Sequence, residues 1–217
     1  MGVTFGAYHS RTNFKLDYIH KEIPAPETKT ASVSIPLVHG DIDLTERLTG
    51  PDPVFQNREL VFGFELRSMR SSWMSDYSDI LSKIHGRILD VGLDEDPGYT
   101  WRGRVTVGPL EDHGFTAGIT ITVDAFPFKW KTTADGTYTY TLSGATTETI
   151  NITTQIAKPV FTFSSSNSIE VTYDGQVFVA TDVIGSPPGL LLHKGSSQSI
   201  KLDGTGAVTF KYYGGYL

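Results

Sequence analysis

A single amphipathic helix is predicted in a sequence that otherwise consists mostly of strand-like segments. Residues 73–86 read WMSDYSDILSKIHG, and apolar side chains recur there at the spacing of one helical face. They are Trp73, Tyr77, Ile80, Leu81 and Ile84. We expect Ser75 or Asp76 to cap its start and Gly86 to end it in the left-handed conformation. Because a helix of roughly ten residues is marginal alone in water, its apolar stripe must dock on a sheet.

The strands that such a sheet needs lie on both sides of the helix. Arg87–Leu93 and Tyr99–Val107 flank the turn DEDPG, which has Pro and Gly where a turn requires them. Thr116–Asp124 alternates apolar and polar residues after them, and Leu60–Leu66 does so before the helix. Shorter strands are expected at Val3–Tyr8, Phe14–Ile23 and Thr28–Pro36. In Thr28–Pro36, Ala31, Val33 and Ile35 share one side and Ser32 and Ser34 the other.

Residues 37–57, LVHGDIDLTERLTGPDPVFQN, mix apolar residues with turn formers. We expect a projecting β-hairpin arm in which Asp41–Leu48 pairs with Phe55–Leu60 around a Gly-Pro-Asp-Pro tip. Exposed apolar groups on such an arm promote aggregation unless a partner covers them. The candidate subunit-interface residues are Ile42, Leu44, Leu48, Val54 and Phe55. The alternative is an arm that folds back on its own sheet.

The composition changes after Asp124–Trp130, and Thr, Ser and Gly dominate the rest of the chain. Asp-Gly and Ser-Gly pairs separate alternating runs there, which is a strong hairpin signal. The expected strands are Thr137–Leu142, Thr147–Ile152, Val160–Ser164, Ser168–Tyr173, Val177–Thr181, Gly189–His193, Ser199–Leu202 and Val208–Tyr213. Short strands without a helix predict a jelly-roll β-sandwich. The whole chain is therefore expected to be mainly β, with domains 1–130 and 131–217.

The bulk properties argue against several classes of protein. No apolar run approaches the roughly 18 residues of a membrane span, and the start MGVTFGAYHSR lacks the order of a signal peptide. We therefore expect synthesis in the cytoplasm and no membrane insertion. The chain has no Cys, which rules out disulfides. A net charge of −6 without a basic run argues against a nucleic-acid binder.

No sequence pattern points to catalysis, so we expect no enzyme activity, no cofactor and no metal. The six His are dispersed, and the chain has no nucleophile elbow and no Gly-rich phosphate loop. The acidic run Asp94–Asp96 leaves a Ca²⁺ site open beside the interpretation as a solvated turn. Trp73, Trp101 and Trp130 are either sugar-stacking platforms or core anchors, and their apolar neighbours favour the core.

Several segments, taken in their order along the chain, resemble the siphophage distal tail protein family, often called Dit. They are FGAYHSRTNFKL, ASVSIPLVHGDIDLTERLTG, FQNRELVFGFEL, ILSKIHGR, LDEDPGYTWRGRV, DAFPFKW and the closing FKYYGGYL. Leu37 departs from the family, in which Gly often follows the proline at this turn. That departure affects the geometry at the start of the arm.

The resemblance implies a β-sandwich-like N-terminal domain with one helix, at about residues 75–85, and an arm, at about 37–58. A galectin-like jelly-roll β-sandwich would follow. The N-terminal domains would close into a homo-hexameric ring at the virion tail tip. The ring would join the tail tube protein to the tail-associated hub or lysin protein and serve as a docking platform for receptor-binding proteins. DNA would pass through its channel without specific binding.

Two other interpretations stay open. The first is a carbohydrate-binding module for host cell-wall polysaccharide, because galectin-like sandwiches can bind glycans. Against it, no Trp follows Trp130, and a shared fold does not confer an activity. The second is a minor tail-tube or contractile-tip adaptor, which would differ only in its partners.

Overall fold

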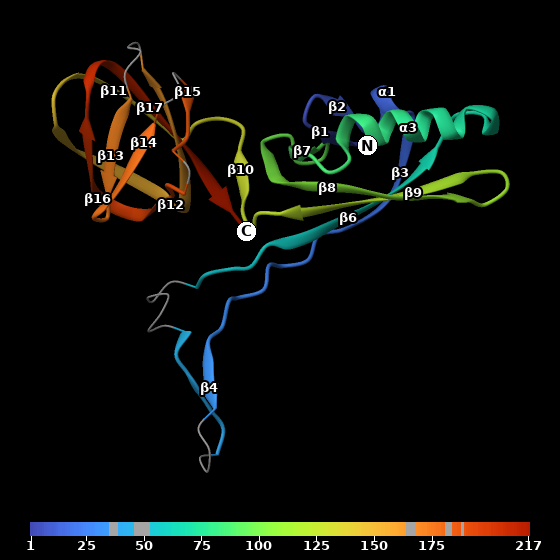
Figure 1. The fold of residues 1–217 in the computed structure, drawn as a ribbon, viewed down its shortest axis with the longest axis horizontal. Helices are drawn as coiled ribbons and strands as arrows, with labels where there is room; N and C mark the ends of the chain where they lie inside the picture. The colour runs from blue at the N-terminus through green and yellow to red at the C-terminus, as the bar shows by residue number, and fades with distance from the viewer. Residues whose placement is uncertain (35–38, 46–52, 164–167, 181–183, 188) are drawn as a thin grey trace. The chain divides into compact units, whose positions relative to one another are not determined.

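The computed structural model of this 217-residue chain describes residues 1–34, 39–45, 53–163, 168–180, 184–187 and 189–217. The chain divides into two compact units, Met1–Pro127 (unit 1) and Phe128–Tyr216 (unit 2) (Figure 1). Each unit has its own hydrophobic core, and both are mainly β, as predicted. None of the helices in the described ranges is long and apolar enough to cross a membrane.

Unit 1 is an antiparallel sheet that curls over its own core. Its strands are β1 (Val3–Phe5), β2 (Tyr8–His9), β3 (Leu16–Glu22), β6 (Arg58–Leu66), β7 (Ile88–Leu93), β8 (Tyr99–Asp112) and β9 (Ala117–Ala125), in the order β2-β1-β7-β8-β9-β6-β3. Three strands separate β1 from β6, yet the Phe5 ring meets those of Phe62 and Phe64 at centroid distances of 6.2 and 6.3 Å. The sheet therefore curls around the side chains that point inward from its strands.

Helix α3 (Trp73–Ile84) packs on this core, as the sequence predicted. Three of its side chains are buried and two more pack partly against the core: Trp73, Ile80 and Ile84, then Tyr77 and Leu81. The helix begins before the predicted caps, directly after the 3-10 turn η1 (Arg70–Ser72), and Ser75 instead donates its hydroxyl to the Ser72 carbonyl. Gly86 takes the left-handed conformation with φ of 74°, as predicted.

One side chain of α3 and one just after it also satisfy the backbone of β8 where β7 no longer runs beside it. β7 pairs only with Thr100–Arg104 of β8. Beyond that point, His85 Nδ1 accepts the Val107 N–H at 3.0 Å, and the Tyr77 hydroxyl donates to the Gly108 carbonyl at 3.0 Å. The helix thus replaces a neighbouring strand, so this stretch of β8 is not an open sheet edge.

A short helix, α1 (Ser10–Phe14), stands where the sequence predicted only loop and the start of a strand. His9 Nδ1 accepts the N–H groups of Arg11 and Thr12 at 3.2 and 3.4 Å, which caps the helix. Lys15 ends it with a φ of 55°, and β3 follows at once. A five-residue helix is too short for a helical periodicity to appear in the sequence.

Unit 2 is a second antiparallel sheet closed over a core, consistent with the predicted β-sandwich. Its strands are β10 (Lys129–Lys131), β11 (Gly136–Ser143), β12 (Thr146–Phe163), β13 (Ile169–Tyr173), β14 (Gln176–Ala180), β15 (Ile184–Gly185), β16 (Leu192–Asp203) and β17 (Thr205–Tyr216). The main order is β14-β13-β16-β12-β17-β11. Ala180 of β14 and Leu142 of β11 belong to one core although their strands lie at opposite ends of that order. The sheet must therefore fold over on itself.

Several strands predicted as separate are single long strands. Thr147–Ile152 and Val160–Ser164 belong to β12, apart from Ser164, which lies outside the described residues. The first part of β12 pairs with β16 and the later part with β17, with register shifts between Ile150 and Ile156. Such irregularities bend a strand and increase its twist, so one strand can serve two sides of a core. The prediction had placed two separate strands there and left residues 153–159 unassigned.

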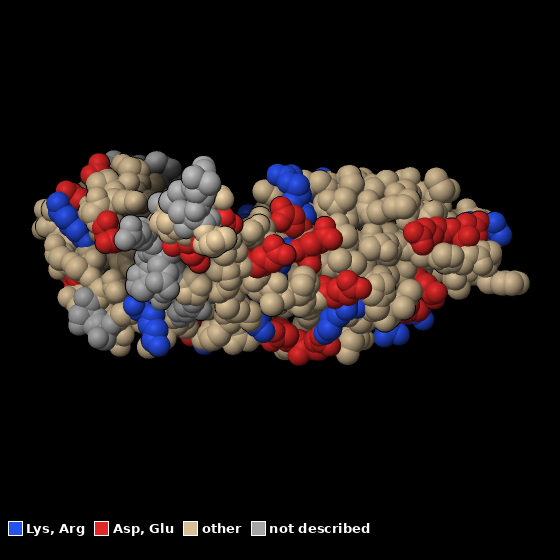
Figure 2. All heavy atoms as spheres, turned by 90° about the horizontal axis from the view of Figure 1, so that it is seen from below, with Lys and Arg blue, Asp and Glu red and all other residues tan. Residues whose placement is uncertain are grey.

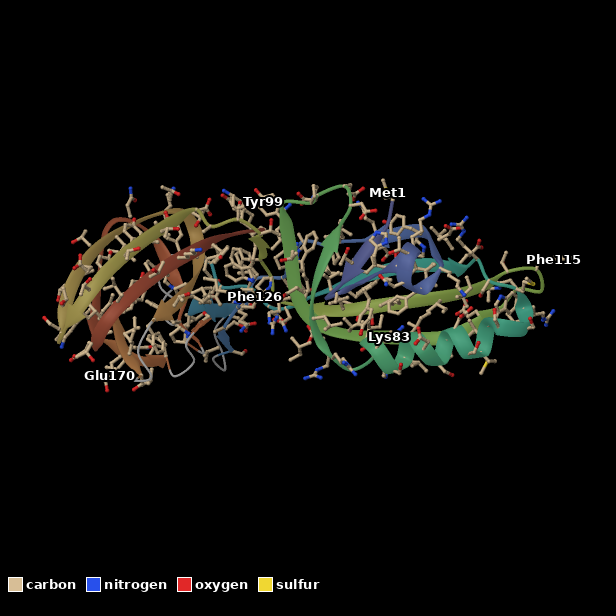
Figure 3. All side chains as sticks on the ribbon, turned by 90° about the horizontal axis from the view of Figure 1, so that it is seen from above. Met1, Lys83, Tyr99, Phe115, Phe126 and Glu170 are labelled. Carbon is tan, nitrogen blue, oxygen red and sulfur yellow. The ribbon has the colours of Figure 1, made fainter. Side chains whose placement is uncertain are left out.

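The tryptophans are core residues, as the sequence favoured. Trp73, Trp101 and Trp130 expose 5%, 4% and 8% of their surface, so none presents a ring for sugar stacking. Phe115, by contrast, lies at the turn between β8 and β9 and is fully exposed, pointing away from the unit (Figure 3). Aromatic side chains therefore build the cores, with a clear exception at this hairpin tip.

Candidate self-association surface

The segment between β3 and β6 forms a two-stranded ribbon that leaves the sheet of unit 1 (Figure 1). Near its outer end, β4 (Ser32–Ser34) pairs with β5 (Asp41–Asp43), and Val33 lies directly opposite Ile42. Nearer the sheet, Thr28 forms a bridge with Phe55. We call residues 27–34, 39–45 and 53–56 the arm.

The pairing inside the arm differs from the prediction. Asp41–Leu48 was expected to pair with Phe55–Leu60, but β5 pairs with β4, and Arg58–Leu60 belongs to β6. The two connections, residues 35–40 and 49–54, are equally long, so loop length does not favour either pairing. The predicted Gly-Pro-Asp-Pro tip lies mostly outside the described residues, as does Leu48.

The arm has one apolar and one polar face. Residues opposite each other on paired strands point to the same side, and successive residues alternate. The register therefore puts Ala31, Val33, Ile42 and Leu44 on one face, and Ser32, Ser34, Asp41 and Asp43 on the other. Val33 and Ile42 are 47% and 44% exposed, so the apolar face lacks a covering layer in the described chain.

The predicted interface residues divide into two groups. Ile42 and Leu44 lie together on the apolar face, while Val54 and Phe55 lie at the base of the arm, where Val54 is exposed and Phe55 half-buried. Leu48 is outside the described residues. The prediction omitted Val33, which completes the apolar face, although the alternation around it was the available signal.

Thr45 forms hydrogen bonds to both sides of the β4–β5 hairpin. Its hydroxyl accepts the Ala31 N–H at 2.9 Å, and its own N–H donates to the Asp43 carboxylate at 2.8 Å. Hydrogen bonds from the Thr45 side chain and backbone lower the pKa of Asp43. The polar face therefore carries negative charge at neutral pH and favours solvent or a basic partner, whereas the apolar face favours burial.

A two-stranded ribbon is at best marginally stable in water, so this arm requires support beyond its own hydrogen bonds. Full burial of a Val, Leu or Ile side chain contributes about 1.5–3 kcal/mol. The exposed halves of Val33 and Ile42 leave much of that stabilisation unused in the single chain. The arrangement is suited to association.

The outward face of the unit 1 sheet is acidic across β3, β6 and β9. Asp17 lies opposite Glu65, and Glu59 lies opposite Asp124. Small residues occupy the outward positions between them: Gly63, Gly118, Thr120 and Thr122. Figure 2 shows Asp and Glu side chains gathered on this side of the unit. The same face also carries basic groups, because Arg104 of β8 lies opposite Asp124 and Arg67 pairs with Asp17 at 3.0 Å. Its carboxylates are therefore partly neutralised by ion pairs.

The acidic turn after β7 is occupied by contacts within unit 1. His9 Nε2 lies 3.1 Å from an Asp94 carboxylate oxygen, and Glu95 forms an ion pair with Lys21. Across the described ranges, no three His, Asp or Glu side chains gather in a way that could hold a metal ion. The turn therefore fits the interpretation as a structural element better than the Ca²⁺ alternative.

A polar groove lies on the outer side of unit 2, beside the turn between β13 and β14. Its lining includes Thr147, Thr172, Tyr173, Asp174, Gly175, Gln198, Ser199 and Lys201. Tyr173 is only 6% exposed, and its hydroxyl donates to Gln198 Oε1 and accepts the His193 N–H, both at 3.1 Å. The groove presents hydrogen-bonding groups but no aromatic platform, so the carbohydrate alternative gains little from it.

The whole chain has the fold of a solved phage protein. The crystal structure of SPP1 Dit (gp 19.1), described as a paradigm of the hub adsorption apparatus in phages that infect Gram-positive bacteria, matches with a TM-score of 0.59. The match covers 100% of this chain and 99% of that one at 13% sequence identity. No protein-family model and no curated protein matches the sequence. The expected resemblance is thus confirmed at the level of the fold.

Proposed function

We propose that this chain is a structural protein of a phage tail tip that works by packing against copies of itself. The observation that carries the proposal is the arm, whose apolar face is uncovered in the single chain. The likeness to SPP1 Dit over the full length supports the same role. An arm that covers a different surface of the next copy makes a heterologous contact, and such contacts close into a ring when the rotation allows.

In this proposal the ring is hexameric and connects the tail tube protein to the tail-associated hub protein. Unit 1 forms the ring, and unit 2, proposed to be galectin-like, serves as the docking platform for receptor-binding proteins. The candidate interface residues are Ile42, Leu44, Leu48, Val54 and Phe55, to which the structure adds Val33. The protein then resides at the virion tail tip and has no catalytic role.

The first test replaces the two most exposed side chains of the apolar face, as Val33→Ser with Ile42→Ser. Because each substitution removes the free energy gained by burying an apolar side chain, we expect self-association to weaken at least about tenfold per side chain. Light scattering and negative-stain imaging of the purified chain measure this directly. Ser32→Ala with Ser34→Ala, on the opposite face of the same ribbon, is the matched control. Rings that persist in the Val33/Ile42 variant would exclude the arm as the clasp.

We further propose that the acidic outward sheet face lines the ring's channel, so that DNA passes without binding. Glu59 and Asp124 lie opposite each other there. Charge reversal by Glu59→Lys with Asp124→Lys would create a basic surface, and we expect salt-dependent retention of duplex DNA by assembled rings. Glu170→Lys, on unit 2, is the control. Binding of duplex DNA by the wild-type protein at physiological salt would contradict this assignment.

A further inference from the structure

Arg58, the first residue of β6 at the root of the arm, is a buried cation with incomplete hydrogen bonding. It exposes 7% of its surface, and none of the ion pairs found in the described chain includes it. Nη1 donates to the Pro24 carbonyl at 3.3 Å, which is long for such a bond. Nε and Nη2 are enclosed and lack an acceptor among the described residues.

The two nitrogens without acceptors are the pair that form the side-on fork of the guanidinium. The Nε–H and one Nη2–H point in parallel and match the two oxygens of a single carboxylate. The Arg58 guanidinium carbon lies 5.6 Å from the centre of the Trp101 ring, and this contact holds the group in place. Arg58 therefore has the geometry of a preorganised carboxylate receptor.

Because Arg58 is charged, the missing hydrogen bonds destabilise the single chain more than they would for a neutral group. Burial lowers the pKa of Arg58, but an arginine starts so high that the group stays protonated at neutral pH. A buried charge with two unpaired donors destabilises the folded protomer unless an anion is supplied. The cost makes sense if assembly supplies that anion.

We propose that the Arg58 fork receives an acidic side chain from a second copy of this chain when the ring assembles. The proposal rests on the self-association argued above. The chain has 24 acidic and 18 basic residues, so a neighbouring copy presents mainly carboxylates. Because Nε and Nη2 are enclosed in the single chain, the proposal requires the Pro24 segment, which contacts Nη1, to move when the carboxylate binds.

The test is Arg58→Met, which keeps much of the side chain's volume and removes the unpaired charge. We expect opposite effects on the two states: the thermal midpoint of the protomer rises by about 2–4 °C, while self-association weakens at least about tenfold. Arg58→Lys keeps a charge but loses the fork, so it should weaken association without raising the midpoint. Differential scanning calorimetry under dissociating conditions and sedimentation analysis of the purified full chain give the two readouts.

Arg67→Met is the matched control, because Arg67 is exposed and pairs with Asp17 at 3.0 Å; it should change neither readout. A lower midpoint for Arg58→Met, or unchanged association of both Arg58 variants, overturns this inference. If the Val33/Ile42 variant still loses rings in that case, the proposed function stands without it. A wild-type chain that stays monomeric at all concentrations would overturn both.

Discussion

β9 in the body of unit 1 and the β4–β5 ribbon in its arm follow the same alternating pattern with opposite outcomes. In β9, Ile119, Ile121 and Val123 expose 2% or less of their surface. In the ribbon, Val33 and Ile42 also share one apolar face, yet they remain 47% and 44% exposed. The local pattern is the same, so the difference arises from what lies above each face.

This contrast shows that alternation decides which side chains share a face, while a second layer decides whether that face becomes a core. Helix α3 and the curl of the sheet supply that layer for β9. In the described chain the ribbon has no such layer, and in the proposed function a second copy provides it. Substitutions in the body should therefore act on folding, and substitutions in the arm on assembly.

The largest effect on folding is expected for Phe62→Ala in the body. Phe62 is fully buried, and its ring meets that of Phe5, so truncation leaves a cavity and should lower the free energy of unfolding by about 3–5 kcal/mol. Denaturant titration of the full chain measures this. The adjacent Val61→Ala, on the outward face, should cost less than about 1 kcal/mol. Similar losses for both would mean that the inward and outward faces are not distinct.

A smaller effect is expected where α3 replaces a strand beside β8. Tyr77→Phe removes the hydrogen bond to the Gly108 carbonyl and should lower the free energy of unfolding by about 1 kcal/mol. Hydrogen exchange should also become faster in this part of β8. Ser78→Ala, on the exposed side of the same helix, is the control. Unchanged exchange would show that the helix does not protect the strand.

The acid sensitivity of the body should depend partly on Asp76. The neighbouring Ser68 hydroxyl, Lys15, and the Ser72 hydroxyl, which donates to the carboxylate at 3.2 Å, lower its pKa. The folded-state pKa lies below the unfolded one, so its stabilisation is complete above the unfolded pKa of about 3.9 and is lost as pH falls through the folded value. Asp76→Asn should therefore flatten the stability curve below about pH 4. A variant with the wild-type acid profile would refute this role.

The smallest effect on folding is expected in the arm, where Val33→Ser with Ile42→Ser should change the free energy of unfolding by no more than about 0.5 kcal/mol. The same variant should lose self-association, which would separate the arm from the body most clearly. Chemical unfolding at low protein concentration gives the first value. A loss above about 1 kcal/mol would show that the protomer itself covers the apolar face, and the contrast would fail.

The elements whose signals are local could be predicted from neighbouring residues alone. The apolar stripe of α3, the left-handed Gly86, the inward residues of β6 and β9 and the mainly β class all followed from spacing. The buried state of Trp73, Trp101 and Trp130 followed from their apolar neighbours. The resemblance to the Dit fold likewise came from ordered segments along the chain and is confirmed for the full length. These features need only the chemistry of nearby residues.

Tertiary structure alone decided which segments meet. β5 had possible partners on either side of it in the sequence and pairs with β4, and the continuity of β12 depended on two neighbours far away in sequence. The orphaned fork of Arg58 was invisible in the sequence, because it arises from where Trp101 and Pro24 lie in space. The alternation of side chains along a strand determines which residues share a face. Packing between segments far apart in the sequence determines what covers that face.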